Sequence, residues 1–200
     1  MLNIAFDLKN QIISDLESSS NLEKISYENL LIMGMGGSGV AGDVMKVLSN
    51  EISDKNIIVH KDYSIPKQFL KFRPLCLFIS YSGNTEETLS GISDAKKNNL
   101  DWIVISSGGK LIDIAQNEGK EYIKIPSGLQ PRAAFGYLTL AISRILDIVE
   151  VDLNNQESTL KTLLELVLLG DLVSLNLANK LTINPQNIDT IENLKKLLGE

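Results

Sequence analysis

Cysteine and histidine each occur only once in this sequence of 200 residues. The single cysteine, Cys76, excludes a disulfide within the chain and a zinc site built from several cysteines. It lies in the apolar run 75–79, which predicts a buried position in a strand. The single histidine, His60, closes another apolar run, where we interpret it as an ordinary strand-end residue. We expect no metal site and no cofactor.

Basic residues and long hydrophobic runs are also scarce. The chain has 19 Lys and Arg against 25 Asp and Glu, a formal net charge of -6 that argues against a nucleic-acid-binding surface. The most apolar stretch, 160–181, is interrupted by Lys161, Glu165, Asp171 and Lys180, too many charges for a membrane span. The N-terminus lacks the pattern of a secretory signal. We expect a soluble, cytoplasmic protein without nucleic-acid or membrane partners.

The pattern of apolar residues divides the chain into three parts. Residues 1–25 predict mainly one amphipathic helix, with an apolar stripe spaced by four. Residues 26–150 alternate expected strands with expected helices, which predicts a doubly wound parallel α/β sheet. The strands are expected at 29–33, 56–60, 75–80, 102–106 and 122–125, and the helices at 40–48, 86–98, 111–118 and 133–149. Residues 151–200 predict a helical segment, with helices at 158–181 and 191–198.

A glycine-rich loop, Gly34-Met35-Gly36-Gly37-Ser38-Gly39, follows the first expected strand. Glycines allow close backbone approach and positive φ, and the helix that follows offers unpaired N–H groups to an anion. The same letters match G-x-G-x-x-G, a dinucleotide-binding fingerprint, for which Asp62 would close the second strand. From these residues alone, phosphate, NAD and a tight turn without a ligand all stay open.

A second loop, residues 80–85, follows the third expected strand and opens a helix. The hydroxyls of Ser80, Ser82 and Thr85 can surround a phosphate with short charge-assisted hydrogen bonds. The structural alternative is a helix cap, with Asn84 capping and Glu87 reaching back. One cap needs one such residue and this loop has four, which favours a phosphate. Two phosphate-type loops at one edge favour a compact phosphorylated ligand over a dinucleotide.

Two further loops fall on the same edge of the expected sheet. Residues 106–110, SSGGK, follow the fourth strand, and residues 130–133, QPRA, follow the fifth. Pro131 suits the first position of a helix, so Arg132 would project from a helix start near the ligand. An arginine there could bind hydroxyls or stabilise a developing oxyanion, and the alternative is an ordinary surface arginine.

The motifs NLLIMGMGGSGVAGD, ISYSGNTEET, ISSGGKL and QPRAA, in this order, resemble those of the bifunctional phosphoglucose/phosphomannose isomerases of the sugar isomerase (SIS) superfamily. The resemblance covers about residues 25–150. It implies a three-layer αβα sandwich with a five-stranded parallel, flavodoxin-like sheet, and a homodimer that binds a phosphorylated hexose. It also implies substrate-binding roles for Gly37, Ser38, Ser80, Ser82, Thr85 and Arg132, with Arg132 near the reacting end of the sugar as an enediolate stabiliser.

The activity implied by the resemblance is the interconversion of glucose 6-phosphate or mannose 6-phosphate with fructose 6-phosphate. The family has two SIS domains in tandem, and its catalytic Glu and His lie beyond the first. Residues 175–181 resemble the lead-in to that second half, and His60 matches no catalytic position. We therefore expect residues 26–150 to be the phosphate-binding half, followed by a missing or incomplete second SIS domain. The alternatives are a non-catalytic SIS binding module and, on the first loop alone, an NAD-linked dehydrogenase.

Overall fold

The computed structural model describes residues 8–12, 14–19, 25–52, 54–146, 167, 170, 173, 176, 177 and 180–182. The chain forms two compact units, Met1–Asn155 and Gln156–Glu200. In the second unit, the described residues of the expected helix at 158–181 are helical as far as Lys180. The expected helix at 191–198 lies outside the described residues.

A six-stranded sheet forms the centre of the first unit, in the order β1-β6-β5-β4-β2-β3. Five of these strands are parallel, as expected, and β1 adds an antiparallel edge next to β6. The expected sheet is therefore confirmed, with one additional short strand. The strands are β1 (Glu17–Ser18), β2 (Asn29–Gly34), β3 (Asn56–His60), β4 (Leu75–Ile79), β5 (Trp102–Ser106) and β6 (Tyr122–Lys124).

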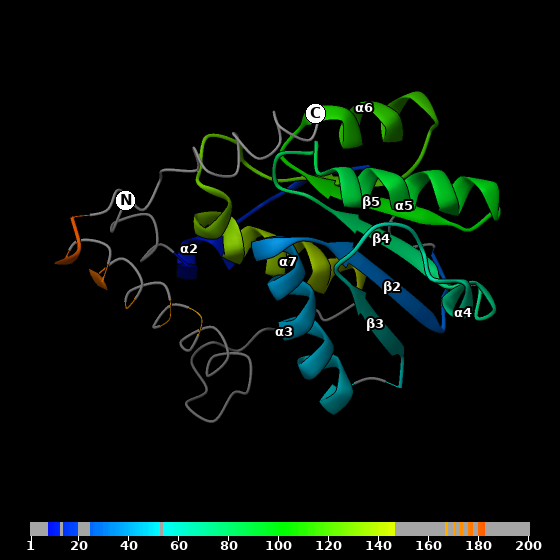
Figure 1. The fold of residues 1–200 in the computed structure, drawn as a ribbon, viewed down its shortest axis with the longest axis horizontal. Coiled ribbons are helices and arrows are strands. Elements are labelled where there is room, and N and C mark those ends of the chain that lie inside the picture. The colour runs from blue at the N-terminus through cyan, green and yellow to red at the C-terminus, as the bar shows by residue number, and fades with distance from the viewer. Residues whose placement is uncertain are drawn as a thin grey trace. The chain divides into compact units, whose positions relative to one another are not determined.

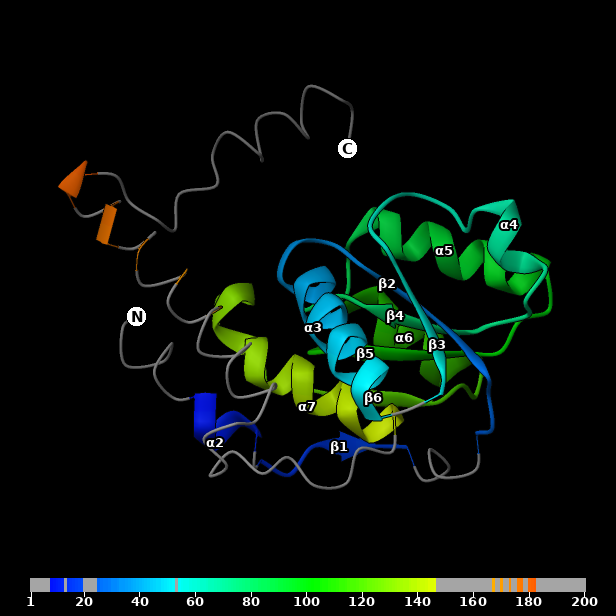
Figure 2. The ribbon, with the colours of Figure 1, turned by 90° about the horizontal axis from the view of Figure 1, so that it is seen from below.

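Helices cover both faces of this sheet (Figures 1 and 2). Helices α3 (Gly36–Ile52) and α7 (Phe135–Ile145) lie on one face, and α5 (Glu86–Lys97) and α6 (Gly109–Asn117) lie on the other. Every residue of β4 and β5 is buried because helices cover both faces of the sheet, and all of these residues except Ser106 are apolar. Cys76 is fully buried in β4, which confirms the expectation for the single cysteine. The short helix α4 (Lys67–Leu70) lies between β3 and β4, and the 3₁₀ turn η2 (Pro131–Ala134) lies between β6 and α7.

The expected N-terminal helix does not run unbroken to residue 25. Helix α2 spans only Leu8–Ile12, and β1 follows at Glu17–Ser18, so no single helix runs to residue 25. The segment 14–18 is not helical because its backbone groups bond to other parts of the fold. Arg144 Nη1 donates to the Leu16 carbonyl oxygen at 3.2 Å, and β1 pairs with β6. Short isolated helices are marginal in water, so such contacts decide the outcome.

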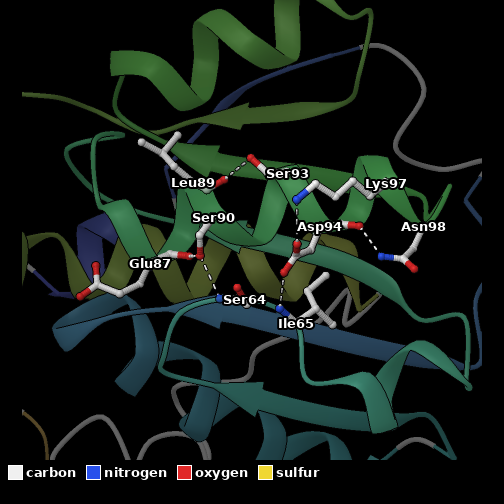
Figure 3. A network of polar contacts seen from close by, with 9 residues as sticks. All are labelled: Ser64, Ile65, Glu87, Leu89, Ser90, Ser93, Asp94, Lys97 and Asn98. Carbon is white, nitrogen blue, oxygen red and sulfur yellow. Dashed lines mark hydrogen bonds and ion pairs between the residues drawn. The ribbon is translucent and has the colours of Figure 1, made fainter.

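Polar contacts fix α5 to the connection between β3 and α4 (Figure 3). The Ser64 N–H donates to Ser90 Oγ at 2.9 Å, and the Ile65 N–H donates to Asp94 Oδ2 at 3.0 Å. Ser64 has a φ of 58°, which is uncommon for a residue other than glycine. Because α5 begins at the second loop singled out above, these contacts help to place that loop.

The order of the strands locates the site. The chain leaves β2 towards β3 on one side and leaves β4 towards β5 on the other, although β2 and β4 are neighbours. Ligands of such sheets bind in the crevice beyond the carboxyl ends of the strands at this switch point. The glycine-rich loop follows β2 and the serine-rich loop follows β4, so both loops meet at this place.

Candidate functional site

The glycine loop, Gly34–Gly39, turns the chain from β2 into α3. Gly36 has a φ of 50°, which favours glycine, and begins the helix. A Cβ atom on Gly34 would lie 2.9 Å from the Ile79 carbonyl oxygen and 3.1 Å from Ser38 Cβ. Ser38 is therefore buried against the end of β2, beside the last residue of β4.

The serine loop, Ser80–Thr85, brings together the three hydroxyls predicted from the sequence. Ser80 Oγ and Thr85 Oγ1 share a hydrogen bond of 2.7 Å, and Ser80 Oγ lies 3.4 Å from Ser82 Oγ. The Gly83 N–H donates to Ser80 Oγ at 3.1 Å, which closes the loop. Ser80 is buried, Thr85 is half-buried and Ser82 is exposed.

The helix-cap interpretation of this loop is wrong, because neither Asn84 nor Glu87 caps α5. The capping position of α5 is Thr85, and no side chain caps the helix. Asn84 Nδ2 donates instead to the Ser82 carbonyl oxygen at 3.2 Å, while Asn84 Oδ1 accepts the Lys110 N–H at 3.1 Å. The first turn of α5 thus has no side-chain cap, and an uncapped N-terminus beside clustered hydroxyls suits an anion.

The buttress loop, Ser106–Lys110, supports the serine loop from β5. Ser107 Oγ donates to the Tyr81 carbonyl oxygen at 2.7 Å, and Ser106 Oγ donates to the Gly108 carbonyl oxygen at 2.8 Å. Ser106 Oγ also lies 3.4 Å from the Tyr81 carbonyl oxygen, so both hydroxyls contact the backbone of the serine loop and differ in role from those of Ser80 and Ser82.

The arginine turn, Gln130–Ala133, lies next to the glycine loop. A Cβ atom on Gly37 would lie 3.7 Å from the Pro131 carbonyl oxygen and 3.9 Å from Arg132 Cα. Pro131 begins η2, and Arg132 is exposed. The structure therefore places Gly37 and Arg132 side by side although 95 positions separate them in the sequence.

Tyr81 is a site residue that the sequence analysis did not identify. Its ring is buried, its hydroxyl donates to the Pro126 carbonyl oxygen at 3.2 Å, and the Leu129 N–H donates to the same hydroxyl at 2.8 Å. Tyr81 thus ties the serine loop to the segment that leads into the arginine turn. Its place between two serines gave no signal of this, because the contact joins loops that are distant in sequence.

His60 and Asp62 lie apart from the hydroxyl cluster, at the end of β3. The His60 ring meets Phe69 edge-on at 6.2 Å, and its Nε2 lies 3.4 Å from the Tyr63 carbonyl oxygen. Asp62 Oδ1 accepts the Tyr63 N–H at 2.7 Å. Both side chains have local partners, as expected of ordinary residues at a strand end.

In the described ranges, no group of three or more His, Cys, Asp or Glu side chains is arranged to hold a metal ion. Nor does any helix of those ranges combine the length and apolarity needed to cross a membrane.

Two family models match the chain. The SIS domain model matches residues 25–129, and the model of the bacterial phospho-glucose isomerase C-terminal SIS domain matches residues 136–198. The first match contains the glycine, serine and buttress loops.

Curated relatives are similar to much of the chain. The chain is 38% identical over 151 residues to the bifunctional phosphoglucose/phosphomannose isomerase of Caldicellulosiruptor bescii, covering 74% of this chain and 44% of that protein. It is 45% identical over 117 residues to the enzyme of the same name from Thermoplasma acidophilum, covering 58% and 35%. It is also 35% identical over 137 residues to a D-glucosamine-6-phosphate 4-epimerase from Sulfolobus acidocaldarius, covering 68% and 41%. The chain thus spans less than half the length of these relatives.

Solved structures share the fold. The C-terminal domain of glucosamine-fructose-6-phosphate aminotransferase from Francisella tularensis superposes with a TM-score of 0.54 at 19% identity, covering 90% of this chain and 57% of that one. A likeness at this identity concerns the fold alone. Together with the SIS model, which matches more than half of the residues, it leads to one conclusion: the chain belongs to the SIS domain family.

Proposed function

We propose that the chain binds the phosphate of a phosphorylated hexose in the serine loop. The observation that carries this proposal is the hydroxyl cluster of Ser80, Ser82 and Thr85 at the uncapped N-terminus of α5. A phosphate monoester carries between one and two negative charges at neutral pH, and such charge is stabilised by hydroxyl donors and by the positive end of a helix dipole. Gly37 and Ser38 complete the site from the glycine loop.

We further propose that this binding serves the interconversion of glucose 6-phosphate or mannose 6-phosphate with fructose 6-phosphate. The names of most of the curated relatives support this reaction. In this proposal the chain supplies the phosphate-binding half of the enzyme and acts as a cytoplasmic homodimer. The reaction opens the sugar ring and moves a proton between C1 and C2 through an enediolate.

Arg132 is the residue of this chain that we assign to the reacting end of the sugar. It lies in the arginine turn beside Gly37, so a ligand held by both the glycine and serine loops would lie close to this turn. A guanidinium is always charged, so it can stabilise a developing oxyanion but cannot act as the base.

A non-catalytic SIS module that binds the same ligand is the alternative. It accounts for the single histidine, His60, which has local partners away from the hydroxyl cluster. The isomerase is favoured because relatives at 38% and 45% identity carry that name.

Thermal unfolding in the presence of ligand tests the proposal. A ligand at a hundred times its Kd stabilises the folded state by about 2.7 kcal/mol, which for a chain of this size is a rise in Tm of roughly 5–10 °C. We expect this rise with fructose 6-phosphate or glucose 6-phosphate and none with NAD. The reverse result would contradict the proposal.

Ser82→Ala provides the matched variant, because the Ser82 side chain is exposed and its Oγ accepts only a 3.3 Å hydrogen bond from the Asn84 N–H beside the 3.4 Å contact with Ser80. Loss of a hydrogen bond to a charged ligand weakens binding by about 10- to 100-fold. Ser93→Ala, on the outer face of α5, is the control, and we expect it to bind like the wild type.

A further inference from the structure

The Asn84 side chain links the serine loop to the buttress loop. Its Nδ2 donates to the Ser82 carbonyl oxygen at 3.2 Å, within the serine loop. Its Oδ1 accepts the Lys110 N–H at 3.1 Å, and Lys110 lies in the first turn of α6. The Asn84 amide therefore joins the backbone of Ser82 to that of Lys110 in the buttress loop.

Two glycines allow the loops to approach closely enough for this link. A Cβ atom on Gly83 would lie 1.8 Å from the Gly108 carbonyl oxygen, and one on Gly109 would lie 2.5 Å from the Ser82 carbonyl oxygen. Both glycines have positive φ, 72° and 69°. The same Cβ on Gly109 would lie 3.0 Å from both the Oδ1 and Nδ2 atoms of Asn84, so the amide fills the space between the loops.

The contact fixes the part of the serine loop that carries Ser82. The Asn84 N–H donates to Ser82 Oγ at 3.3 Å, and the Leu111 N–H donates to the Gly83 carbonyl oxygen at 3.0 Å. Ser82 itself is exposed, so little packing holds its hydroxyl in place. Its orientation depends on the backbone around it, which the Asn84 amide holds against the buttress loop.

We propose that Asn84 is the positioning residue of the phosphate site, an inference that rests on the proposed phosphate binding. The amide holds the Ser82 peptide against the buttress loop and thereby keeps the serine-loop hydroxyls arranged before the ligand arrives. A preformed arrangement binds more tightly because the ligand need not order the loop. Asn84 acts through the loop and makes no contact with the sugar.

The test compares the Kd of inorganic phosphate with the Kd of glucose 6-phosphate for the wild type and Asn84→Ala. A residue that positions the phosphate cup affects both ligands alike, because both present the same phosphate. We expect Asn84→Ala to weaken both by roughly 5- to 10-fold, the effect of about one hydrogen bond. Gly109→Ala, which disturbs the same contact from the buttress loop, is expected to weaken both ligands too.

Asn98→Ala is the matched control, because Asn98 Nδ2 also donates to a backbone carbonyl oxygen, that of Asp94 at 2.8 Å, at the far end of α5. It should lower Tm about as much as Asn84→Ala and leave both Kd values unchanged. Unchanged binding of inorganic phosphate by Asn84→Ala would overturn the inference, and so would weakening of glucose 6-phosphate alone. If Gly109→Ala does not fold, the comparison of Asn84→Ala with Asn98→Ala still tests whether Asn84 positions the phosphate site.

The two proposals fail in different ways. A wild-type chain that binds inorganic phosphate but not glucose 6-phosphate would refute the hexose assignment, and the asparagine variants could still be compared with inorganic phosphate. A wild-type chain that binds neither ligand would overturn both proposals.

Discussion

Ser80 and Ser82 carry the same hydroxyl two positions apart, and the fold gives them different surroundings. Ser80 is 2% exposed, and its Oγ accepts the Gly83 N–H and shares a hydrogen bond with Thr85. Ser82 is exposed. The sequence motif predicted that both serines lie in one loop at a helix start. It could not predict this difference, because the difference depends on the positive φ of Gly83 and on the approach of Gly108 from another strand.

Cys76 leads to a prediction about pH. Burial, reinforced by the charge of Asp101, raises the pKa of its thiol from 9.0 to about 12. Between about pH 9 and pH 12 the unfolded chain therefore loses a thiol proton that the folded chain retains. The free energy of unfolding then falls as the pH rises, by about 1.4 kcal/mol per pH unit from this group alone. Denaturant titrations between pH 8 and pH 11 measure this fall.

Cys76→Ala serves as the control, because it removes the thiol and leaves the other titratable groups of the chain in place. We expect its stability to fall less steeply above pH 9 than that of the wild type. A thiol reagent at pH 8 should also label the wild type far more slowly in its folded state than in denaturant. Equal slopes for the two proteins would show that the thiol titrates alike in both states.

At the scale of elements, the strands were predicted more closely than the helix starts. The expected strand at 56–60 matches β3, and the expected strand at 102–106 matches β5. Helix α3 begins at Gly36 instead of residue 40, within a glycine-rich segment of low helix propensity. It forms there because glycine lets the helix approach the sheet, since a Cβ on Gly39 would lie 2.6 Å from the Gly34 carbonyl oxygen. Contacts of this kind are not visible in a local pattern.

Gly91 provides a prediction for the packing of α5 on the sheet. A Cβ atom there would lie 2.6 Å from Met33 Sδ and 2.7 Å from Phe78 Cε1, both in fully buried side chains. Gly→Ala within an exposed helix usually stabilises it by about 1 kcal/mol. Here we expect the opposite, a loss of about 1–3 kcal/mol from overpacking and a fall in Tm of roughly 2–12 °C, measured by thermal unfolding.

Ser93→Ala is the control, because Ser93 lies two positions further along the same helix but on its exposed face. We expect its free energy of unfolding to stay within about 0.5 kcal/mol of the wild-type value. If Gly91→Ala is as stable as the wild type or more stable, α5 has room to move away from β2 and β4.

At the scale of the whole molecule, the strand order brings the four loops to one edge of the sheet. The alternation of strands and helices predicted a parallel sheet, and right-handed crossovers restrict its possible orders. The sequence also placed the glycine and serine loops at the carboxyl ends of strands. It did not predict β1, because a two-residue strand has no periodicity of its own and exists only by pairing with β6.

The chain of 200 residues is expected to bind a hexose phosphate without isomerising it at an enzyme-like rate. Proton transfer between adjacent carbons needs a positioned base, whose loss alone costs a factor of about 10²–10⁴. His60 lies at the end of β3 with local partners. Glu86 and Glu87 lie in the first turn of α5, beside the proposed phosphate cup and away from the reacting carbons.

An assay of glucose 6-phosphate formation from fructose 6-phosphate, coupled to a dehydrogenase, measures this activity. A full-length phosphoglucose isomerase is the positive control. Turnover of several molecules per second by the 200-residue chain would show that it contains a catalytic base and acid.

The pairing of β1 with β6 also determines when the sheet can be completed during synthesis. Glu17 pairs with Lys124, and Gln11 donates to the Ala133 carbonyl oxygen, so the N-terminal segment finds its partners only after most of the first unit has been made. At about 5–20 residues per second, a ribosome needs roughly 5–20 seconds to make the intervening chain. The strand β1 is thus made before the other five strands and is among the last to find its place in the sheet.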